Sequence, residues 1–88
     1  MKMVIVSILD TAAGAYGRPA YLASEGVAVR QFQDEVNRQS EDNQLYKHPD
    51  DFQLYYLGTF DDNTGGFDLL ASPKMIARAK DIMIRDGE

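Results

Sequence analysis

The segment Tyr16-Gly17-Arg18-Pro19-Ala20-Tyr21 combines residue types that could hold a nucleic-acid strand. An arginine can bind a phosphate, and tyrosine rings on either side of it can stack on unpaired bases. Glycine and proline between them favour a loop. The alternative is a loop that caps a strand, with Tyr21 in the core. Taken alone, the segment favours this structural alternative.

The stretch from Asp61 to Gly66 could be taken for the start of a calcium loop, because Asp61, Asn63 and Gly65 stand at alternate positions. A calcium loop needs a bidentate glutamate near its end, and Ser72 occupies that position. We therefore interpret the stretch as the turn of a β-hairpin.

His48 stands beside Asp50 and Asp51, a combination that could support acid–base catalysis. No matching nucleophile or second histidine accompanies it, and Pro-Asp-Asp before a strand is ordinary turn composition. The sequence also has no cysteine, no Ser-His-Asp arrangement and no phosphate-binding glycine loop. We expect a structural role for His48, and a protein that is not an enzyme and has no metal, cofactor or small-molecule substrate.

Length and charge set the class of protein. The 88 residues predict one domain, 1–88, with a core over about 2–70. The net charge of −5 argues against a protein that coats nucleic acid by bulk electrostatics. Four of the nine Lys and Arg residues follow Ser72: Lys74, Arg78, Lys80 and Arg85. They form either a solvated surface, which we favour, or a phosphate-binding patch.

The first half of the chain predicts two strands and a helix. Residues 2–9 are apolar on both faces of a strand, and this run is too short to span a membrane. It also lacks the features of a signal peptide, so we expect a cytosolic protein. A loop over 10–19 leads to a short strand over 20–23. Ser24 is a plausible N-cap for the main helix, predicted over 25–38 with an apolar stripe of Val29, Phe32 and Val36.

The second half predicts an aromatic strand, a hairpin return and a last helix. In the strand that starts at Phe52, alternation places Leu54, Tyr56 and Phe60 on the face of Phe52 and places Tyr55 and Leu57 on the other. Phe67 to Leu70 forms a fourth strand. Ser72-Pro73 predicts a helical segment over about 73–85.

The elements therefore predict an α+β fold in the order β-β-α-β-β-α. A small antiparallel sheet of about four strands carries the main helix on one face, and a helix ends the chain. So much apolar strand surface is hard to cover in a short chain, so we expect a homodimer with Tyr55 and Leu57 in the interface. The aromatic strand is either a stacking platform or, as we favour, core plus interface.

Several of these motifs resemble the small non-structural protein of gokushovirus-like microviruses, which are phages with circular single-stranded DNA. The resemblance covers about residues 1–70. It rests on the strand over 3–9 that ends in Asp10, the Arg18-Pro19 loop before Tyr21-Leu22, the helix over 24–36 with Phe32, and the run His48-Pro49-Asp50-Asp51-Phe52-Gln53-Leu54, followed by Leu57-Gly58, Phe60-Asp61-Asp62 and Thr64-Gly65.

The resemblance implies a DNA-binding protein with a part in genome replication or in packaging, and it implies no catalytic residue. The leading hypothesis is a non-enzymatic accessory protein that binds single-stranded DNA as a homodimer in the infected host bacterial cytoplasm. Its contacts are expected from Tyr16, Arg18 and Tyr21 in the loop and from Lys74, Arg78 and Lys80 at phosphates. The alternative is an interaction module that contacts a phage or host protein and no DNA.

Overall fold

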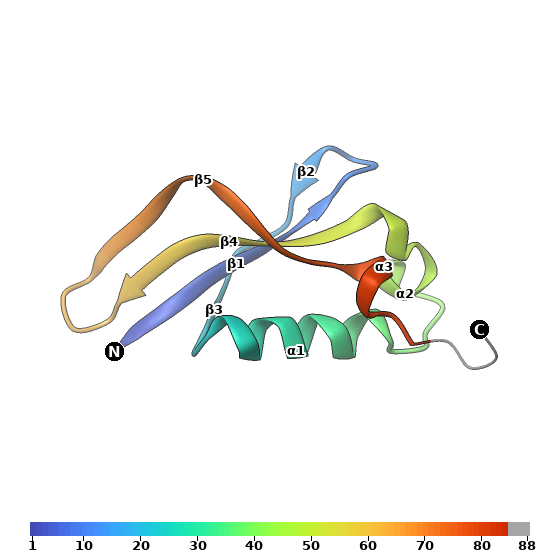
Figure 1. Cartoon of the computed structure of the whole chain (residues 1–88), viewed down its shortest axis with the longest axis horizontal. Helices are drawn as coiled ribbons and strands as arrows, with labels where there is room; N and C mark the ends of the chain where they lie inside the picture. Colours follow the sequence, from blue (N-terminus) through green and yellow to red (C-terminus); the bar gives the residue numbers. More distant parts are fainter. Residues whose placement is uncertain (85–88) are drawn as a thin grey trace.

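The computed structural model describes residues 1–84 as one antiparallel sheet with helices against one of its faces (Figure 1). The predicted α+β class is confirmed, and the predicted order of elements is extended by the short elements β2, α2 and η1. The strands are β1 (Lys2–Asp10), β2 (Ala15–Tyr16), β3 (Ala20–Leu22), β4 (Phe52–Asp61) and β5 (Gly66–Arg78); the helices are α1 (Glu25–Val36), α2 (Gln44–Lys47), the 3-10 turn η1 (Pro49–Asp51) and α3 (Ala79–Ile82).

The sheet has β1 and β4 at its centre and β5 at one edge. β4 pairs with β1 along its length, so β2 and β3, which also pair with β1, share its other side. They are two parts of one returning strand that is interrupted at residues 17–19. At the interruption the Gly17 N–H donates to the Ile8 carbonyl at 2.8 Å, and the Ser7 hydroxyl donates to the Gly17 carbonyl at 2.7 Å.

Both hairpins of the sheet turn by the same chemistry. In each, an aspartate carbonyl accepts the N–H of a glycine four residues later at 2.8 Å, from Gly14 to Asp10 and from Gly65 to Asp61. The two glycines have φ of 68° and 74°, the left-handed region that favours this residue. The hairpin interpretation of 61–66 is confirmed, since β4 and β5 pair from Asp61↔Gly66 onward.

Helix α1 begins at its predicted cap and covers the core. The Ser24 hydroxyl accepts from the Val27 N–H at 3.2 Å, and the helix ends at Val36, two residues before the predicted end. The side chains that it buries lie at i, i+4 and i+8, with Ala28 in place of the predicted Val29 at the start of the stripe. The buried core cluster consists of Val6, Ala28, Phe32, Val36, Leu54 and Ala79.

One glycine in α1 has no conformational reason to be glycine. A Cβ at Gly26 would lie 3.8 Å from the Ser24 hydroxyl, an ordinary contact. We expect Gly26→Ala to raise the free energy of unfolding by about 0.5–1 kcal/mol, because alanine loses less backbone entropy in a helix. Urea denaturation measures the free energy of unfolding. Gly14→Ala is the control and should lower that free energy by about 1 kcal/mol. An unchanged or lower midpoint for Gly26→Ala would contradict the expectation.

The predicted helix over 73–85 is wrong over most of its described length. β5 continues to Arg78, and α3 occupies only Ala79–Ile82. Pro73 does not begin a helix; it lies among four residues, 70–73, that have no partner on β4, in a wide bulge between Leu69 and Lys74. A proline is tolerated there, because its missing N–H is not needed in the ladder. Residue 85 lies outside the described residues.

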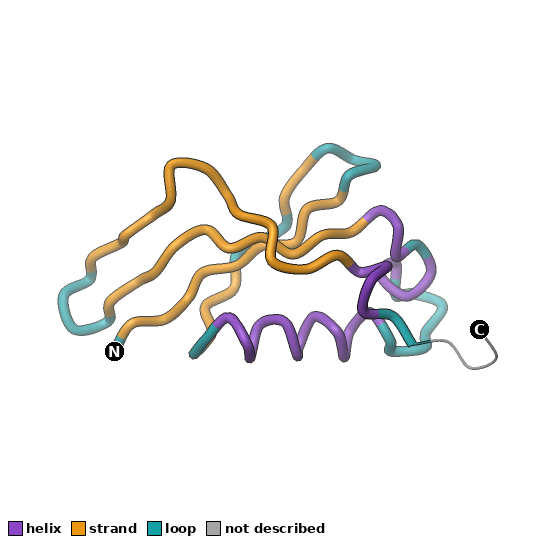
Figure 2. The backbone as a smooth tube through the Cα atoms, viewed as in Figure 1, coloured by secondary structure: helices purple, strands orange, loops and turns teal. Residues whose placement is uncertain are grey.

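The molecule is elongated, with principal extents of 48 × 24 × 20 Å. Figure 2 shows the reason: the β4–β5 hairpin continues past the N-terminal end of α1, while α2 and α3 gather at the other end of the helix. Part of the sheet therefore has no helix beneath it.

Within residues 1–84, none of the helices has the length and apolar character needed to cross a bilayer.

Candidate nucleic-acid interface

The sheet face that points away from α1 carries most of the exposed aromatic side chains, and we call it the outer face. Val6 and Leu54 point into the core cluster, so their strand neighbours Ser7 and Tyr55, which pair with each other, point the other way. The pairing registers extend this face across all strands. Its aromatic and large apolar members include Tyr16, Tyr21, Tyr55, Phe60, Phe67, Leu69 and Met75.

Ring contacts on the outer face agree with these registers. Tyr16 meets Tyr55 edge to face, with ring centroids 5.4 Å apart. Phe60 meets Tyr21 at 6.0 Å and Phe67 at 4.8 Å. Ile5 lies on the outer face beneath these rings and is only 3% exposed. It does not belong to the core cluster, which lies on the helix side of the sheet. The face is therefore a layer of rings that covers the strand beneath and remains open to solvent above.

Tyr16 and Tyr21 each expose 46% of their surface, so Tyr21 does not lie in the core as one interpretation of its loop held. The tyrosines that flank Arg18 in sequence point to the outer face from β2 and β3. Arg18 stands between them at the interruption of the strand. The loop segment is thus the edge of an aromatic surface rather than a cap over it.

A β-bulge changes which aromatic residues share a face. Ile5 pairs with Gly58 and Val6 pairs with Tyr56, so Leu57 is an extra residue of β4 at this point. The predicted alternation is wrong beyond it: Phe60 joins Tyr55 on the outer face instead of lying with Phe52 and Tyr56 on the helix side. Of the two predicted interface residues, Tyr55 lies on the outer face, where its hydroxyl donates to the Gln53 amide oxygen at 3.0 Å, and Leu57 is the half-buried bulge residue.

Negative charge is kept off the outer face of the strands. The strands contain three carboxylates, Asp10, Asp61 and Asp68. Their pairing partners are Phe52, Lys2 and Thr59, which all alternate to the helix side. The net charge of −5 is thus carried by that side and by the loops and helices. The outer face of the sheet should therefore repel phosphate less than the net charge of the chain implies.

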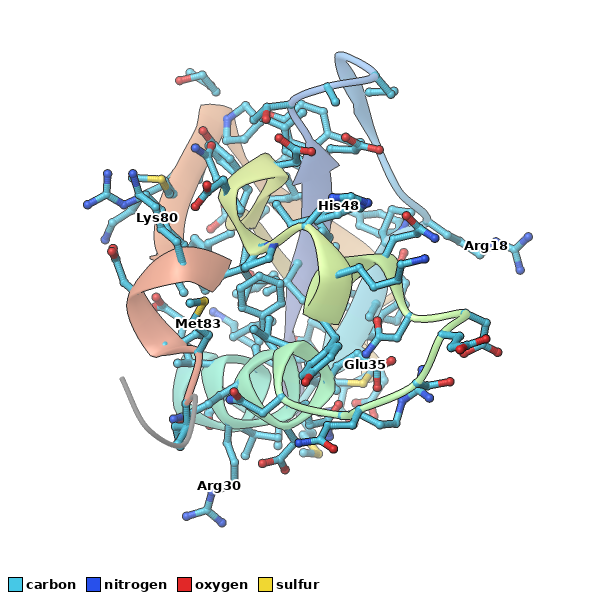
Figure 3. All side chains as sticks on the ribbon, turned by 90° about the vertical axis from the view of Figure 1, so that its right-hand side faces the viewer. Arg18, Arg30, Glu35, His48, Lys80 and Met83 are labelled. Carbon is cyan, nitrogen blue, oxygen red and sulfur yellow. The ribbon has the colours of Figure 1, made fainter. Side chains whose placement is uncertain are left out.

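The predicted cationic residues lie on two opposite edges of the molecule. Arg18 lies on the β2/β3 edge and points away from the body, while Lys80 lies on the far side, beyond the β5 edge (Figure 3). Lys74 pairs with Tyr56, so it points to the helix side, and the Arg78 Nε donates to the Asp81 carboxylate at 2.8 Å. One chain therefore does not bring the two predicted groups together.

Some of the other charged side chains are held by local partners. The Arg38 guanidinium binds the Glu35 carboxylate at 2.7 Å, and this hydrogen bond raises the pKa of Arg38. The Ser40 hydroxyl, which donates to the Asp42 carboxylate, lowers the pKa of that carboxyl. Within residues 1–84, Arg18, Lys74 and Lys80 form no such ion pair, so these three are available to an anionic ligand.

A small pocket opens on the helix side of the β3 edge, between β3 and α1. Its volume is about 260 Å³, and its lining includes Arg18, Glu35 and the small side chains of Ala20 and Ala28. It is smaller than the usual size of small-molecule sites. In the described part of the chain, no three His, Cys, Asp or Glu side chains converge to hold a metal ion. The outer face remains the main candidate surface.

His48 lies between α2 and η1, where its backbone N–H donates to the Gln44 carbonyl at 2.8 Å. It serves as the C-cap of one and the N-cap of the other, in agreement with a structural role. Sequence reasoning missed Leu69 and Met75 as outer-face residues. The alternation of Phe67 and Leu69 about Asp68 could have indicated the first, whereas Met75 was hidden by the expected helix.

Comparison with known proteins identifies the family. The model of the Phage ORF5 protein family matches residues 3–82. The chain is also similar to Protein ORF5 of Chlamydia phage 1, with 36% identity over 69 residues, covering 76% of this chain and 72% of that protein. No solved structure matches the chain. The resemblance to a small phage protein is thereby confirmed, and the chain belongs to the phage ORF5 protein family.

Proposed function

We propose that this protein is a non-enzymatic phage accessory protein that binds single-stranded DNA on its outer face during viral genome replication or packaging in the host bacterial cytoplasm. The observation that carries the proposal is the segregation of side chains on the sheet: the outer face presents aromatic rings, and the strand carboxylates all point to the other side. An aromatic sheet face is a platform on which unpaired bases stack.

The edges of the face complete the expected site. Bases stacked on Tyr16, Tyr21 and Phe67 would leave phosphates near Arg18 at one edge and near Arg78 at the other, where a phosphate would replace the Asp81 carboxylate. Adjacent strands lie about 4.8 Å apart, so a path across the sheet accommodates only a few nucleotides. With so few cations, binding should be weak and should depend strongly on salt.

Titration of a dye-labelled oligothymidylate at low and moderate salt tests the proposal. Arg18→Ala should weaken binding and reduce the slope of log affinity against log salt by about 0.7, the value for one phosphate of a single strand. Arg30→Ala removes the same charge from α1, on the side away from the sheet (Figure 3), and should have little effect. No binding of single- or double-stranded DNA at low salt would refute the proposal.

A second pair of variants separates stacking from charge. Tyr21→Ala removes a half-exposed ring and should weaken binding at least about fivefold, since a stacked base contributes about 1–3 kcal/mol. Tyr21→Phe keeps the ring and should retain the affinity. Equal losses for both variants would show that the ring does not stack.

The rival function is an interaction module for a phage or host protein. The exposed apolar residues of β5 favour it, because large apolar patches often mark protein interfaces. It requires that Arg18→Ala leaves partner binding intact, while aspartate in place of Tyr55 or Leu57 abolishes it. The DNA titrations distinguish the two functions.

A further inference from the structure

We propose that two copies of this chain pair through β5, antiparallel and about a twofold axis at Ala71, and so join their outer faces into one surface. β5 pairs only with β4 among the described strands, and residues 66–75 are all exposed. A long strand edge with free backbone groups is a template for a further strand. A second copy is the occupant that the sequence of β5 fits best.

Exposed apolar side chains are concentrated on this strand. Four of the nine exposed large hydrophobic residues in the described chain lie on β5: Phe67, Leu69, Leu70 and Met75. The opposite edge of the sheet is different, because residues 17–19 interrupt it and Pro19 lacks an N–H. Of the two edges of the described sheet, β5 alone therefore offers an uninterrupted strand for pairing.

Charge complementarity selects the register. With Ala71 at the axis, Asp68 lies opposite the partner's Lys74, and the symmetric contact repeats it. Asp68 pairs with Thr59 and Lys74 with Tyr56, so both charges point to the helix side and meet there. In the same register Phe67 lies opposite the partner's Met75, and both belong to the outer face. Directly opposed charges of opposite sign stabilise an antiparallel pair, and like charges destabilise it.

The bulge and Pro73 are compatible with this register. Residues 70–73 have no partner on β4, so pairing with a second copy there competes with no hydrogen bond inside the sheet. Pro73 would face the partner's Leu69 in a pair of the same type as the two Ala71 residues. The Asp62 N–H donates to the Met1 carbonyl, so alternation along the registers makes this pair the hydrogen-bonded type. The missing N–H of proline therefore removes one hydrogen bond on each side of the axis, and the other backbone groups of residues 69 and 71 remain available for pairing. The small side chain of Ala71 also allows close approach at the axis.

The dimer changes the DNA site, and this consequence rests on the proposed function. A twofold axis perpendicular to a sheet keeps both outer faces on the same side. The two β5 strands then meet at the centre of a doubled platform. Arg78, which lies at the β5 edge in one chain, lies along the central seam in two, while Lys74 stays on the helix side with the partner's Asp68. Arg18 of each copy stands at an outer end of the surface.

A cysteine cross-link tests the dimer directly, since the chain has no cysteine of its own. Directly opposed residues of an antiparallel pair have Cα atoms about 4.5–5.5 Å apart, within the range that a disulfide spans. We expect Ala71→Cys to oxidise to a covalent dimer about 100-fold faster than Ala12→Cys, an exposed residue of the first hairpin, at micromolar protein concentration. Equal rates for the two variants would overturn the proposal.

Charge reversal tests the register independently. In sedimentation or light scattering, Asp68→Lys and Lys74→Glu should each raise the dimer dissociation constant about tenfold or more, and the double exchange should restore it. A single strand pair is a small interface, so mass must be followed over a range of concentrations. A wild-type chain that stays monomeric throughout, or single reversals without effect, would overturn the proposal.

These measurements contain no DNA, so they separate the two proposals. Absence of the dimer would leave DNA binding by one outer face to be tested by its own titration. Failure of a confirmed dimer to bind oligothymidylate would refute the proposed function alone. Circular dichroism checks that each reversed variant keeps its fold, and the cross-linking result does not depend on those variants.

Discussion

Gly58→Ala is expected to lower the free energy of unfolding by about 3 kcal/mol or more, the largest effect of an alanine at any glycine of the described residues. Gly58 is buried and has a φ of 144°. A Cβ there would lie 2.3 Å from the Asp68 carbonyl oxygen and 2.7 Å from the Leu69 Cα. Both are backbone atoms of the adjacent strand, so the hairpin must part to admit a methyl group.

For a domain of this size, a loss of about 3 kcal/mol lowers Tm by roughly 12 °C or more, which calorimetry measures easily. Gly65→Ala is the matched control. Its φ of 74° is also positive, but no atom lies within 4 Å of the added Cβ, so it should cost only about 1–2 kcal/mol. Equal losses at the two glycines would mean that backbone conformation, and not the close approach of β5, decides the effect.

Gly58 also matters for the outer face. It stands immediately after the bulge at Leu57, pairs with Ile5 on one side and Leu69 on the other, and lets β5 approach where the face of the strand changes. The bulge and glycine together direct Phe60 to the outer face. A substitution at Gly58 would therefore disturb the outer face through the fold, so the titrations that test the proposed DNA binding use substitutions of exposed side chains instead.

The class and most elements of the fold could be predicted, because they depend on local chemistry. Alternating β-branched and aromatic residues indicate β1 and β4, Ser24 caps α1, and aspartate and glycine turn the second hairpin. The bulge at Leu57 could not be predicted. It arises from the register between β1 and β4, which a single strand does not encode, and it reverses the faces of all later residues.

The prediction of a C-terminal helix was wrong for a related reason. Ser72-Pro73 has the composition of a helix start, and the same pair also suits a bulge in an edge strand. Only the presence of β4 beside it decides between them, since β4 offers partners to residues 74–78. Once β5 continues, Lys74 and Arg78 no longer share one helix face, so the predicted basic face is divided.

The candidate site was predictable in its parts and not in its arrangement. Tyr16, Arg18 and Tyr21 were identified as one candidate segment, because glycine and proline break the strand between the tyrosines, but the favoured alternative with Tyr21 in the core is wrong. Their neighbours on the outer face come from strands far away in sequence. The contact of Tyr21 with Phe60, and of Phe60 with Phe67, depends on the pairing of three strands.

Asn43→Asp is expected to destabilise the protein by about 3 kcal/mol near neutral pH, although it changes one atom of the side chain. Asn43 is 3% exposed, and its amide nitrogen donates to the carbonyls of Glu35 at 2.7 Å and Arg38 at 2.8 Å. Its amide oxygen accepts the Leu45 N–H at 3.2 Å and so caps α2. A carboxylate keeps the cap but turns both donor contacts into repulsion.

The pH dependence identifies this cause. Burial beside two carbonyl oxygens favours the protonated acid, so the pKa of the new carboxyl in the folded state rises above its unfolded value of about 3.9. The folded state then binds more protons than the unfolded state, so stability falls as pH rises from the unfolded pKa through the folded one. Urea midpoints at several pH values, relative to wild type, should show a loss that grows toward neutral pH. Gln39→Glu, the same change of chemistry at an exposed position, should show neither the loss nor the trend. A loss in the Asn43→Asp variant that is constant with pH would mean that only the hydrogen bonds matter, and not the buried charge.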